Sequence, residues 1–506
     1  LLDLPVPAPV PEGGGQLGGA WYARPMAAPR LLSRAAPPPA AVEPATRPVG
    51  LALVLGYLGF HLVLGVAGLL SPMVATAHAA VTTLALVGAA IWGRDLAQLV
   101  MLTAYASLSD VYWRMTESRA PWGFSKYLLV FGSLAMLIRF ARPWRRAGQP
   151  LLFLALLVPG MAALLVSQGL GGVSREAFSS VEMGLVALGL ASLAFRQVVA
   201  TEADAWNLGW VLLGPVVSTL AITTWATLTT ADLEFTDESN FNVTAGFGPN
   251  QVSVILGLGI LVCALLAYQR RGPRFLAVLV GLGLWLTWAA FLTFSRGGVY
   301  SLVIAGGALV LVGVATRGAR VRSIATAVVG VAGLMLMFAS VNDFTGNWLD
   351  TRYERGGSAT TGRSDLAEQD LAVWGENPLL GVGSAQSIYH HTGGNLSRAS
   401  THTEYTRLVA EHGLFGLAAI GVLVAMFVSG LRQARSQWNR LLVAGAGVWA
   451  LTTMLHAATR LAAVSLLFAL TQLRVDPDPV RLAAVRVRRR FGGADAVRGT
   501  GSTPEG

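Results

Sequence analysis

The sequence predicts an all-α membrane protein that crosses the bilayer many times. Over 506 residues the hydrophobic fraction is 54% and the charged fraction is 13%, whereas soluble chains average about 25% charged residues. Apolar runs of about 18 to 20 residues recur along the chain, and each can cross a hydrocarbon layer of about 30 Å as a helix. Because a helix satisfies its own backbone polar groups in lipid, we expect a polytopic bundle of about 12 to 14 transmembrane helices.

Fourteen apolar runs are the candidate spans. They cover residues 49–70, 76–92, 95–109, 126–141, 150–167, 179–195, 207–227, 249–268, 275–294, 298–315, 323–341, 413–430, 441–457 and 461–473. The second, third and last of these runs are short, so twelve or thirteen spans are also possible.

We divide the chain into four parts. Residues 1–47 are rich in Pro, Ala and Gly without apolar periodicity, and we expect a disordered cytoplasmic tail. Residues 48–227 form an N-terminal transmembrane bundle, and residues 228–475 form a second membrane domain that includes a large outer-face loop, 342–412. Residues 476–506 are a basic cytoplasmic tail.

The orientation follows from the basic loops, because Arg and Lys near the ends of spans stay cytoplasmic. Most of the arginines fall on one side when the N-terminus is placed inside. Both termini are then cytoplasmic, whereas loops 228–248 and 342–412 face outward. Since the net charge of +10 lies in short loops and tails, it indicates membrane topology and not a nucleic-acid partner.

Chemistry on the outer face needs a donor that is already activated. No phosphate-binding loop or dinucleotide fingerprint follows a predicted strand, and ATP and nucleotide sugars are absent outside the cell. The usual solution is a lipid-linked pyrophosphate, although a transporter would need no donor. Cys263 is the only cysteine, which excludes an intrachain disulfide and a cysteine metal site.

Two arginines on the predicted outer face are candidates for binding phosphate. Arg296 lies between two spans, where Gly297 and Gly298 could let a ligand approach the backbone; the alternative is an interfacial anchor. Arg363 precedes a short amphipathic helix that ends at Asn377-Pro378, so it would lie at an anion-attracting N-terminus. The alternative for Arg363 is a solvated loop residue that pairs with an acid.

A candidate general base lies where the large loop enters a span. Thr401 and Glu404 fit a capping box, so His402 would occupy the first position of a helix. The N-terminus of a helix disfavours imidazolium, which would keep His402 neutral and able to accept a proton; the alternative is an interfacial histidine. No pair of histidines four residues apart lies beside a suitable carboxylate, so we predict neither a metal nor a cofactor.

The order of several motifs resembles the O-antigen ligase and O-antigen polymerase family of bacterial envelope glycosyltransferases. These motifs are GPNQ (248–251), SRGG (295–298), GRSDL (362–366), W-x-x-N-P-L-L-G-V-G (374–383) and H-T-x9-G-L-F-G (402–416). Thr403 stands where the ligases usually have Asn, Ser or Gln. The resemblance covers about residues 205 to 475 and implies a GT-C-like fold in the bacterial plasma membrane.

The resemblance also implies roles for residues. Arg296 and Arg363 would hold the diphosphate of an undecaprenyl-linked glycan, and His402 would activate the hydroxyl of an acceptor glycan or glycolipid, so that transfer inverts the anomeric carbon without a metal. Asn250, Glu404 and Tyr405 are second candidates for positioning. A polysaccharide polymerase would use the same donor. A transporter or flippase is the alternative from another class, and it would need paired charges near the bilayer midplane and an internal repeat.

Overall fold

The computed structural model describes residues 47–93, 95–140, 147–172, 182–231, 233–269, 272–316, 318–354, 363–391 and 403–476. The chain divides into two compact units, Leu1–Val42 and Glu43–Gly506, and the described residues all belong to the second unit. The tails predicted at 1–47 and 476–506 lie almost wholly outside the described residues.

The fold is all-α, as predicted, and each of the predicted spans overlaps one helix. These helices are α1 (Leu51–Leu70), α2 (Pro72–Trp92), α3 (Leu96–Leu108), α5 (Phe124–Phe140), α6 (Gly148–Gly172), α8 (Met183–Phe195), α9 (Glu202–Thr229), α10 (Pro249–Ala267), α11 (Pro273–Leu292), α12 (Arg296–Ala315), α13 (Arg320–Phe344), α17 (Glu404–Gln433), α18 (Gln437–Thr453) and α19 (Ala462–Leu470). Within the described residues, 9 helices are long and apolar enough to cross a membrane. The chain is therefore a polytopic helical membrane protein.

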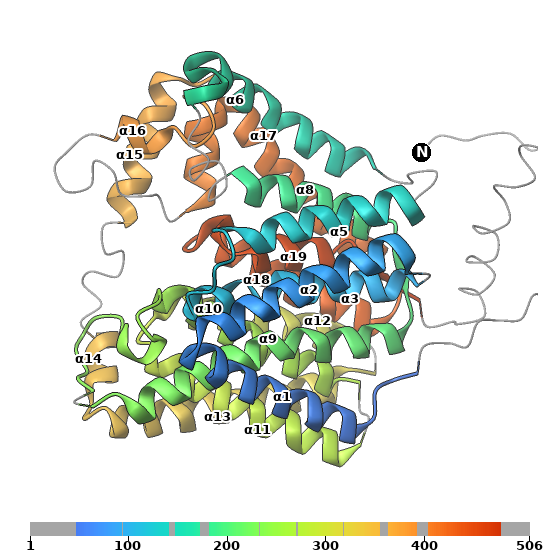
Figure 1. Ribbon diagram of the computed structural model, residues 1–506, viewed down its shortest axis with the longest axis vertical. Helices are drawn as coiled ribbons and strands as arrows, with labels where there is room; N and C mark the ends of the chain where they lie inside the picture. The colour runs from blue at the N-terminus through green and yellow to red at the C-terminus, as the bar shows by residue number, and fades with distance from the viewer. Residues whose placement is uncertain are drawn as a thin grey trace, which may run out of the picture. The chain divides into compact units, whose positions relative to one another are not determined.

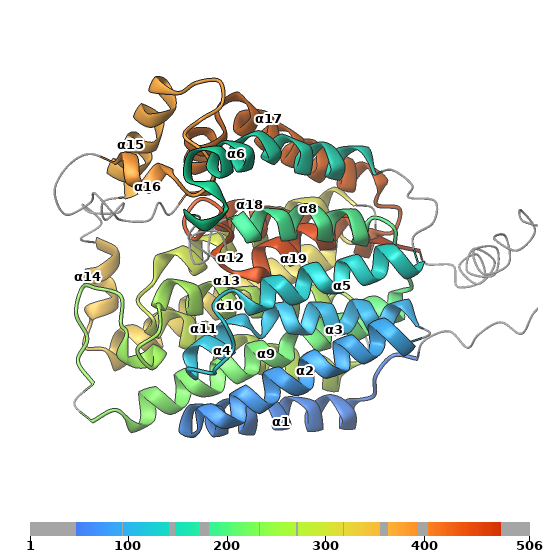
Figure 2. The same cartoon turned by 45° about the horizontal axis from the view of Figure 1, so that its top comes forward.

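Short helices connect the spans. They are α4 (Asp110–Met115), α14 (Trp348–Glu354), α15 (Arg363–Glu376), α16 (Ser387–His390) and the 3-10 helices η2 (Asn242–Thr244) and η5 (Ala458–Arg460). The spans lie side by side across Figures 1 and 2, and α14, α15 and α16 gather at one end of the unit. The large predicted loop therefore contains helices, and it lies at one end of the bundle.

Helices from distant parts of the sequence pack together. α1 packs against α9, α5 and α19 both pack against α8, and α18 packs against α12. Helices such as α9 and α10 are largely buried inside the unit, whereas α13 is exposed along most of its length. The helices before residue 228 and those after it thus share one core.

A small parallel sheet was not predicted. β1 (Val199–Ala200) pairs with β2 (Arg474–Val475), so the residues just before α9 bond to those just after α19. Two residues are too few to show the alternation of apolar and polar residues that predicts a strand.

The helix α17 bends at Gly413, which has φ 57° and ψ −135°. A Cβ atom at this position would lie 2.5 Å from the carbonyl carbon of Leu379, so both the backbone angles and the packing require glycine. The backbone N–H of Leu414 donates to the carbonyl of Pro378 at 2.9 Å, and that of Val382 donates to Ala410 at 3.0 Å. The predicted span that starts at Gly413 therefore begins at a bend of α17, and the 377–383 segment packs against this bend.

Candidate active site

Arg296 lies at the turn between α11 and α12, as predicted, and it is the first residue of α12. The backbone turns at Phe294, which has a φ of 54°. The hydroxyl of Ser295 donates to the side-chain oxygen of Asn250 at 3.3 Å. The carbonyl of Thr293 accepts the backbone N–H of Asn240 at 3.0 Å. The turn that presents Arg296 is thus held by α10 and by the 228–248 loop.

The two glycines after Arg296 serve packing, which differs from the prediction. A Cβ atom at Gly297 would lie 2.4 Å from the side-chain oxygen of Asn250 and 2.7 Å from Nδ1 of His456. A Cβ atom at Gly298 would lie 2.3 Å from the backbone of Ser253. The expectation that a ligand approaches the backbone here is wrong, because protein atoms already occupy that space.

Arg352 of α14 is a second arginine at this turn, and sequence reasoning missed it. Its Nε donates to the carbonyl of Phe294 at 3.3 Å, and its guanidinium also donates to the carbonyl of Asp237. Burial lowers the pKa of Arg352, and the positive charge of Arg296 lowers it further. The two guanidinium groups are therefore close enough to interact. No local motif marks Arg352, since only the fold brings it to the turn.

The three second candidates for positioning bond to the end of α18 or to the segment that follows it. Asn250 donates from its amide to the carbonyl of His456 at 3.2 Å. The hydroxyl of Tyr405 donates to the carbonyl of Leu451 at 2.8 Å. Glu404 is fully buried, and one of its oxygens accepts the backbone N–H of Thr459 at 2.8 Å.

His456 of that segment approaches α12. Its Nε2 lies 2.8 Å from the hydroxyl oxygen of Ser301, one turn and a half after Arg296. Because Asn250 and Glu404 hold the same segment, they link the Arg296 turn to the start of α17. The structure therefore brings these predicted residues together through a segment to which the sequence assigned no role.

The start of α17 differs from the predicted capping box. The helix begins at Glu404, and Thr403 is its N-cap residue without a side-chain hydrogen bond. The carboxylate of Glu404 turns inward to Thr459 and forms an ion pair with Arg407, so it does not bond back to the cap. Thr401 and His402 lie outside the described residues, and the predicted role of His402 stays a prediction.

The helix α15 ends at Glu376, immediately before Asn377-Pro378, as predicted, but it begins at Arg363 itself, which the prediction placed just before the helix. The backbone of Arg363 is described, but its side chain is not. Two turns later the buried carboxylate of Asp370 accepts hydrogen bonds from Nε2 of His391 and from the hydroxyl of Thr406, each at 2.9 Å. Asp370 thus attaches the helix that begins at Arg363 to the start of α17.

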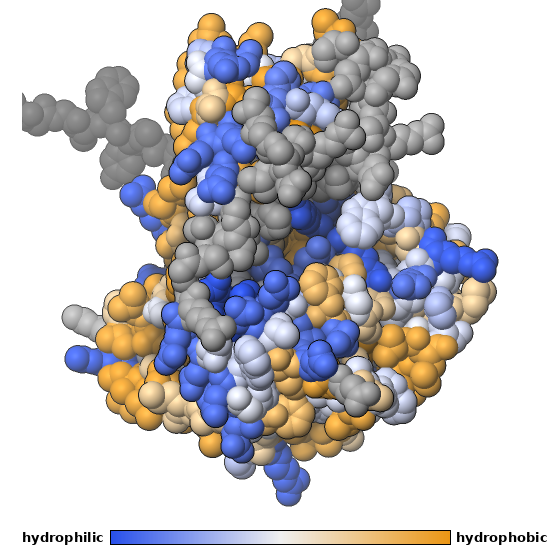
Figure 3. Space-filling model, turned by 90° about the vertical axis from the view of Figure 1, so that its left-hand side faces the viewer, coloured by the Kyte–Doolittle hydropathy of each residue, from blue (hydrophilic) through white to orange (hydrophobic). Residues whose placement is uncertain are grey.

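The end of the unit that carries α14, α15 and α16 is hollowed. In Figure 3, which faces this end, hydrophilic side chains gather in and around the hollow, and hydrophilic and apolar side chains are mixed below it. The hollow lies between the part with α6 and α15 above and the part with α13 and α14 below (Figures 1 and 3).

An apolar groove of about 570 Å³ runs along α12 close to Arg296. Its walls come from α11, α12, α13 and α14, and the residues that line it are Phe291, Val299, Tyr300, Val303, Ile304, Leu334, Met335, Phe338 and Tyr353. Burial raises the pKa of the Tyr353 hydroxyl, and the neighbouring Tyr300 raises it further. The positively charged turn at Arg296 therefore lies beside the apolar groove.

Comparison with protein families matches residues 281–421 to the model of the O-antigen ligase family. This part of the chain is O-antigen ligase-like. The predicted resemblance is confirmed over this range, which is narrower than 205–475 and contains Arg296, Arg363 and His402.

The match supports membrane glycosyltransferase activity of the O-antigen ligase or polymerase type. It runs from α11 through the bend of α17, so the arginine turn, the apolar groove and α15 all belong to the O-antigen ligase-like region. None of the curated proteins matches the chain.

Proposed function

We propose that this O-antigen ligase-like protein transfers a glycan from undecaprenyl diphosphate to an acceptor hydroxyl on the outer face of the plasma membrane. The observation that carries the proposal is the position of Arg296 and Arg352 beside the apolar groove. A polyprenyl diphosphate has the same two parts, an anionic head and a long apolar chain. The site lies in the part 228–475, and both termini are cytoplasmic in this proposal.

The apolar groove suits the polyprenyl chain. Tyr300 and Val303 lie on α12, one and two turns beyond Arg296, and Tyr353 follows Arg352 directly. A chain that occupies this groove would place its diphosphate at the end where the two guanidinium groups lie. Apolar contact there contributes about 25 cal/mol for each Å² removed from water.

The arginines would stabilise the leaving diphosphate. As the bond to the sugar breaks, negative charge develops on the diphosphate oxygen that was bound to the anomeric carbon. Guanidinium groups held in place before the reaction stabilise that charge most effectively. Arg296 would bind the diphosphate from the turn, and Arg363 would approach from the start of α15, where the helix dipole also favours an anion. Arg352 would hold the turn and add positive charge.

His402 would act as general base from the residue before the N-cap of α17. It would take the proton of the acceptor hydroxyl while the oxygen attacks the anomeric carbon and the bond to the diphosphate breaks. Attack from the face opposite the lipid inverts the anomeric centre. The products are the glycosylated acceptor, undecaprenyl diphosphate and a protonated His402, which then loses its proton to water.

The test is transfer by purified protein in nanodiscs supplied with an undecaprenyl-diphosphate glycan and a panel of acceptors. We expect Arg296→Ala, Arg363→Ala and His402→Ala each to lower kcat/KM by at least about 100-fold, a loss typical of groups that act in the transition state. Arg320→Ala is the matched control for the arginines, since Arg320 is exposed and also begins a long helix. His390→Ala is the control for His402.

The identity of the acceptor distinguishes a ligase from a polymerase. Transfer to a second lipid-linked glycan, and to no other acceptor, would identify a polymerase with the same donor site. Full transfer by all three variants would contradict the mechanism, and movement of the glycolipid across proteoliposomes without bond cleavage would support a flippase instead.

A further inference from the structure

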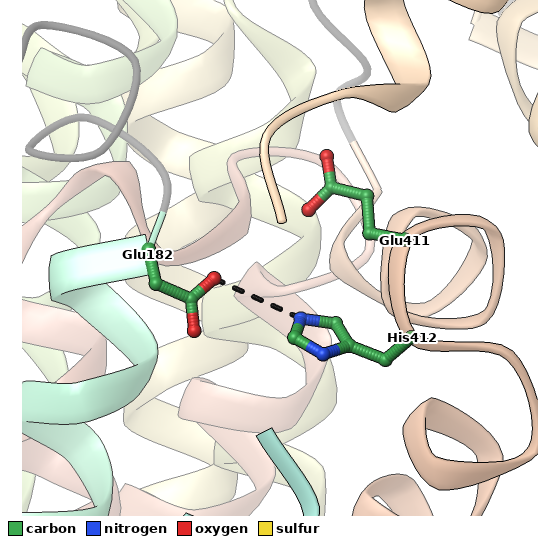
Figure 4. A group of neighbouring side chains, drawn as sticks. All are labelled: Glu182, Glu411 and His412. Carbon is green, nitrogen blue, oxygen red and sulfur yellow. Dashed lines mark ion pairs between the residues drawn. The ribbon is translucent and has the colours of Figure 1, made fainter. Parts of the chain in front are cut away.

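Three ionisable side chains meet in the interior, where α8 begins and α17 bends. Glu182 immediately precedes α8, and Glu411 and His412 are the last residues of α17 before Gly413 (Figure 4). Each is at most 1% exposed, and one nitrogen or oxygen atom from each lies within 4.8 Å of the other two. Burying such groups is costly unless they are paired or coordinate a metal.

Glu182 and His412 lack hydrogen bonds within the described part of the chain. Neither carboxylate oxygen of Glu182 and neither ring nitrogen of His412 has a partner there. Oε2 of Glu182 lies 3.7 Å from Nε2 of His412, which is longer than a hydrogen bond of about 3.2 Å. Two ligand atoms on one tetrahedral zinc ion are about 3.3 Å apart, so a small inward shift would let both bind the same ion.

Neighbouring residues orient the side chains of Glu411 and His412. The hydroxyl of Ser387 donates to Oε1 of Glu411 at 3.1 Å, while Oε2 lies 3.8 Å from Arg407. A Cβ atom at Gly160 of α6 would lie 2.3 Å from Nδ1 of His412, so only glycine lets the imidazole lie here with Nε2 toward Glu182. Such supporting contacts fix the orientation of ligands around a metal.

We infer that Glu182, Glu411 and His412 form a binding site for a divalent transition-metal ion, of which zinc is the representative. An imidazole nitrogen with two carboxylates suits zinc, whereas magnesium and calcium prefer oxygen ligands alone. The ion joins α8 to the first part of α17. The inference does not depend on the proposed transfer reaction. The ligands come from segments far apart in the sequence, so no local spacing predicts the site.

The test is the zinc content of the purified full chain. The protein is stripped with a chelator, titrated with zinc, passed through a desalting column and measured by elemental analysis and thermal unfolding. We expect about one zinc ion per chain and a rise in unfolding temperature, because a ligand that binds only the folded state stabilises it. Glu411→Gln and His412→Gln should each lower zinc affinity by at least about 10-fold.

His78→Gln is the matched control. His78 is a partly buried histidine of α2 that bonds to Tyr105 and Trp113, so its loss should leave the bound zinc unchanged. If the cluster variants fail to fold, the zinc X-ray absorption spectrum of the wild type decides the question, since one imidazole with oxygen ligands is expected. Folded wild type without stoichiometric zinc, equal zinc in all variants, or a spectrum with several imidazoles would each overturn the inference.

Discussion

The carboxylate of Asp370 accepts a hydrogen bond from the hydroxyl of Thr406 at 2.9 Å and thereby joins α15 to α17. Both side chains lie about two turns or less into their helices. Arg363 begins the first helix, and His402 lies just before the second. The distance between Arg363, which is proposed to bind the diphosphate, and His402, the proposed base, therefore depends on this contact.

Replacing Asp370 should weaken that link. We expect Asp370→Ala to lower kcat/KM by about 10- to 100-fold, since small displacements of reacting groups have effects of this size. It should also cost about 1–3 kcal/mol in the free energy of unfolding, because His391 loses its buried partner. Thr406→Val should have a smaller effect in the same direction. Full transfer activity in a stably folded Asp370→Ala protein would separate this contact from catalysis.

Gly413→Ala should destabilise the protein by about 1–3 kcal/mol or more, the cost of a strained left-handed residue with an added clash. The measurement is thermal unfolding in detergent. Gly421→Ala on the same helix is the control, because a Cβ atom there has nothing within 4 Å. An equal effect of the two substitutions would show that the bend tolerates a side chain.

Arg352→Ala should lower kcat/KM by about 10-fold, because it removes a hydrogen bond to the Arg296 turn and a positive charge beside it. Arg352→Lys should restore the share of kcat/KM that depends on the positive charge alone. Arg119→Ala is the control, since Arg119 is an exposed arginine in a loop that is also predicted to face outward. Unchanged kinetics in Arg352→Ala would limit its role to stability.

Filling the apolar groove should discriminate between donors by the length of their lipid. Val303→Trp narrows the groove, so we expect kcat/KM to fall by about 10-fold for a long polyprenyl donor and to change little for a short isoprenoid analogue, whose chain forms fewer apolar contacts. Leu311→Trp, an exposed position of α12 outside the groove lining, serves as the control. Equal losses for both donors would place the lipid elsewhere.

The orientation can be tested through the single buried cysteine. Cys263→Ser removes it, and Glu238→Cys then places a thiol on the exposed part of the 228–248 loop. A membrane-impermeant maleimide should label this thiol in intact spheroplasts. It should label Arg320→Cys only after the membrane is opened. The reverse pattern would invert the predicted topology.

The sequence alone allowed the positions of the apolar helices, the position of Arg296 and the end of α15 to be predicted, although only 9 of the described helices are long and apolar enough to cross a membrane. Hydropathy determines where a helix can cross lipid, and Asn377-Pro378 stops a helix through local chemistry. Arg352 and the partners of Asp370 could not be predicted, because each meets its partner only after distant segments pack. The capping box failed for a related reason: Glu404 matches its pattern, but the buried N–H of Thr459 and the charge of Arg407 compete for the carboxylate.

The pairing of β1 with β2 has a consequence for biosynthesis. Val199 and Ala200 leave the ribosome long before their partners Arg474 and Val475 are synthesised. In the same way, α8 is synthesised long before α19, against which it packs. Nearly every helix after α8 must therefore enter the membrane before the first half of the bundle obtains its final neighbours. Because α19 is the last helix of the unit to be synthesised, a nascent chain that stalls before it would leave α8 without that partner.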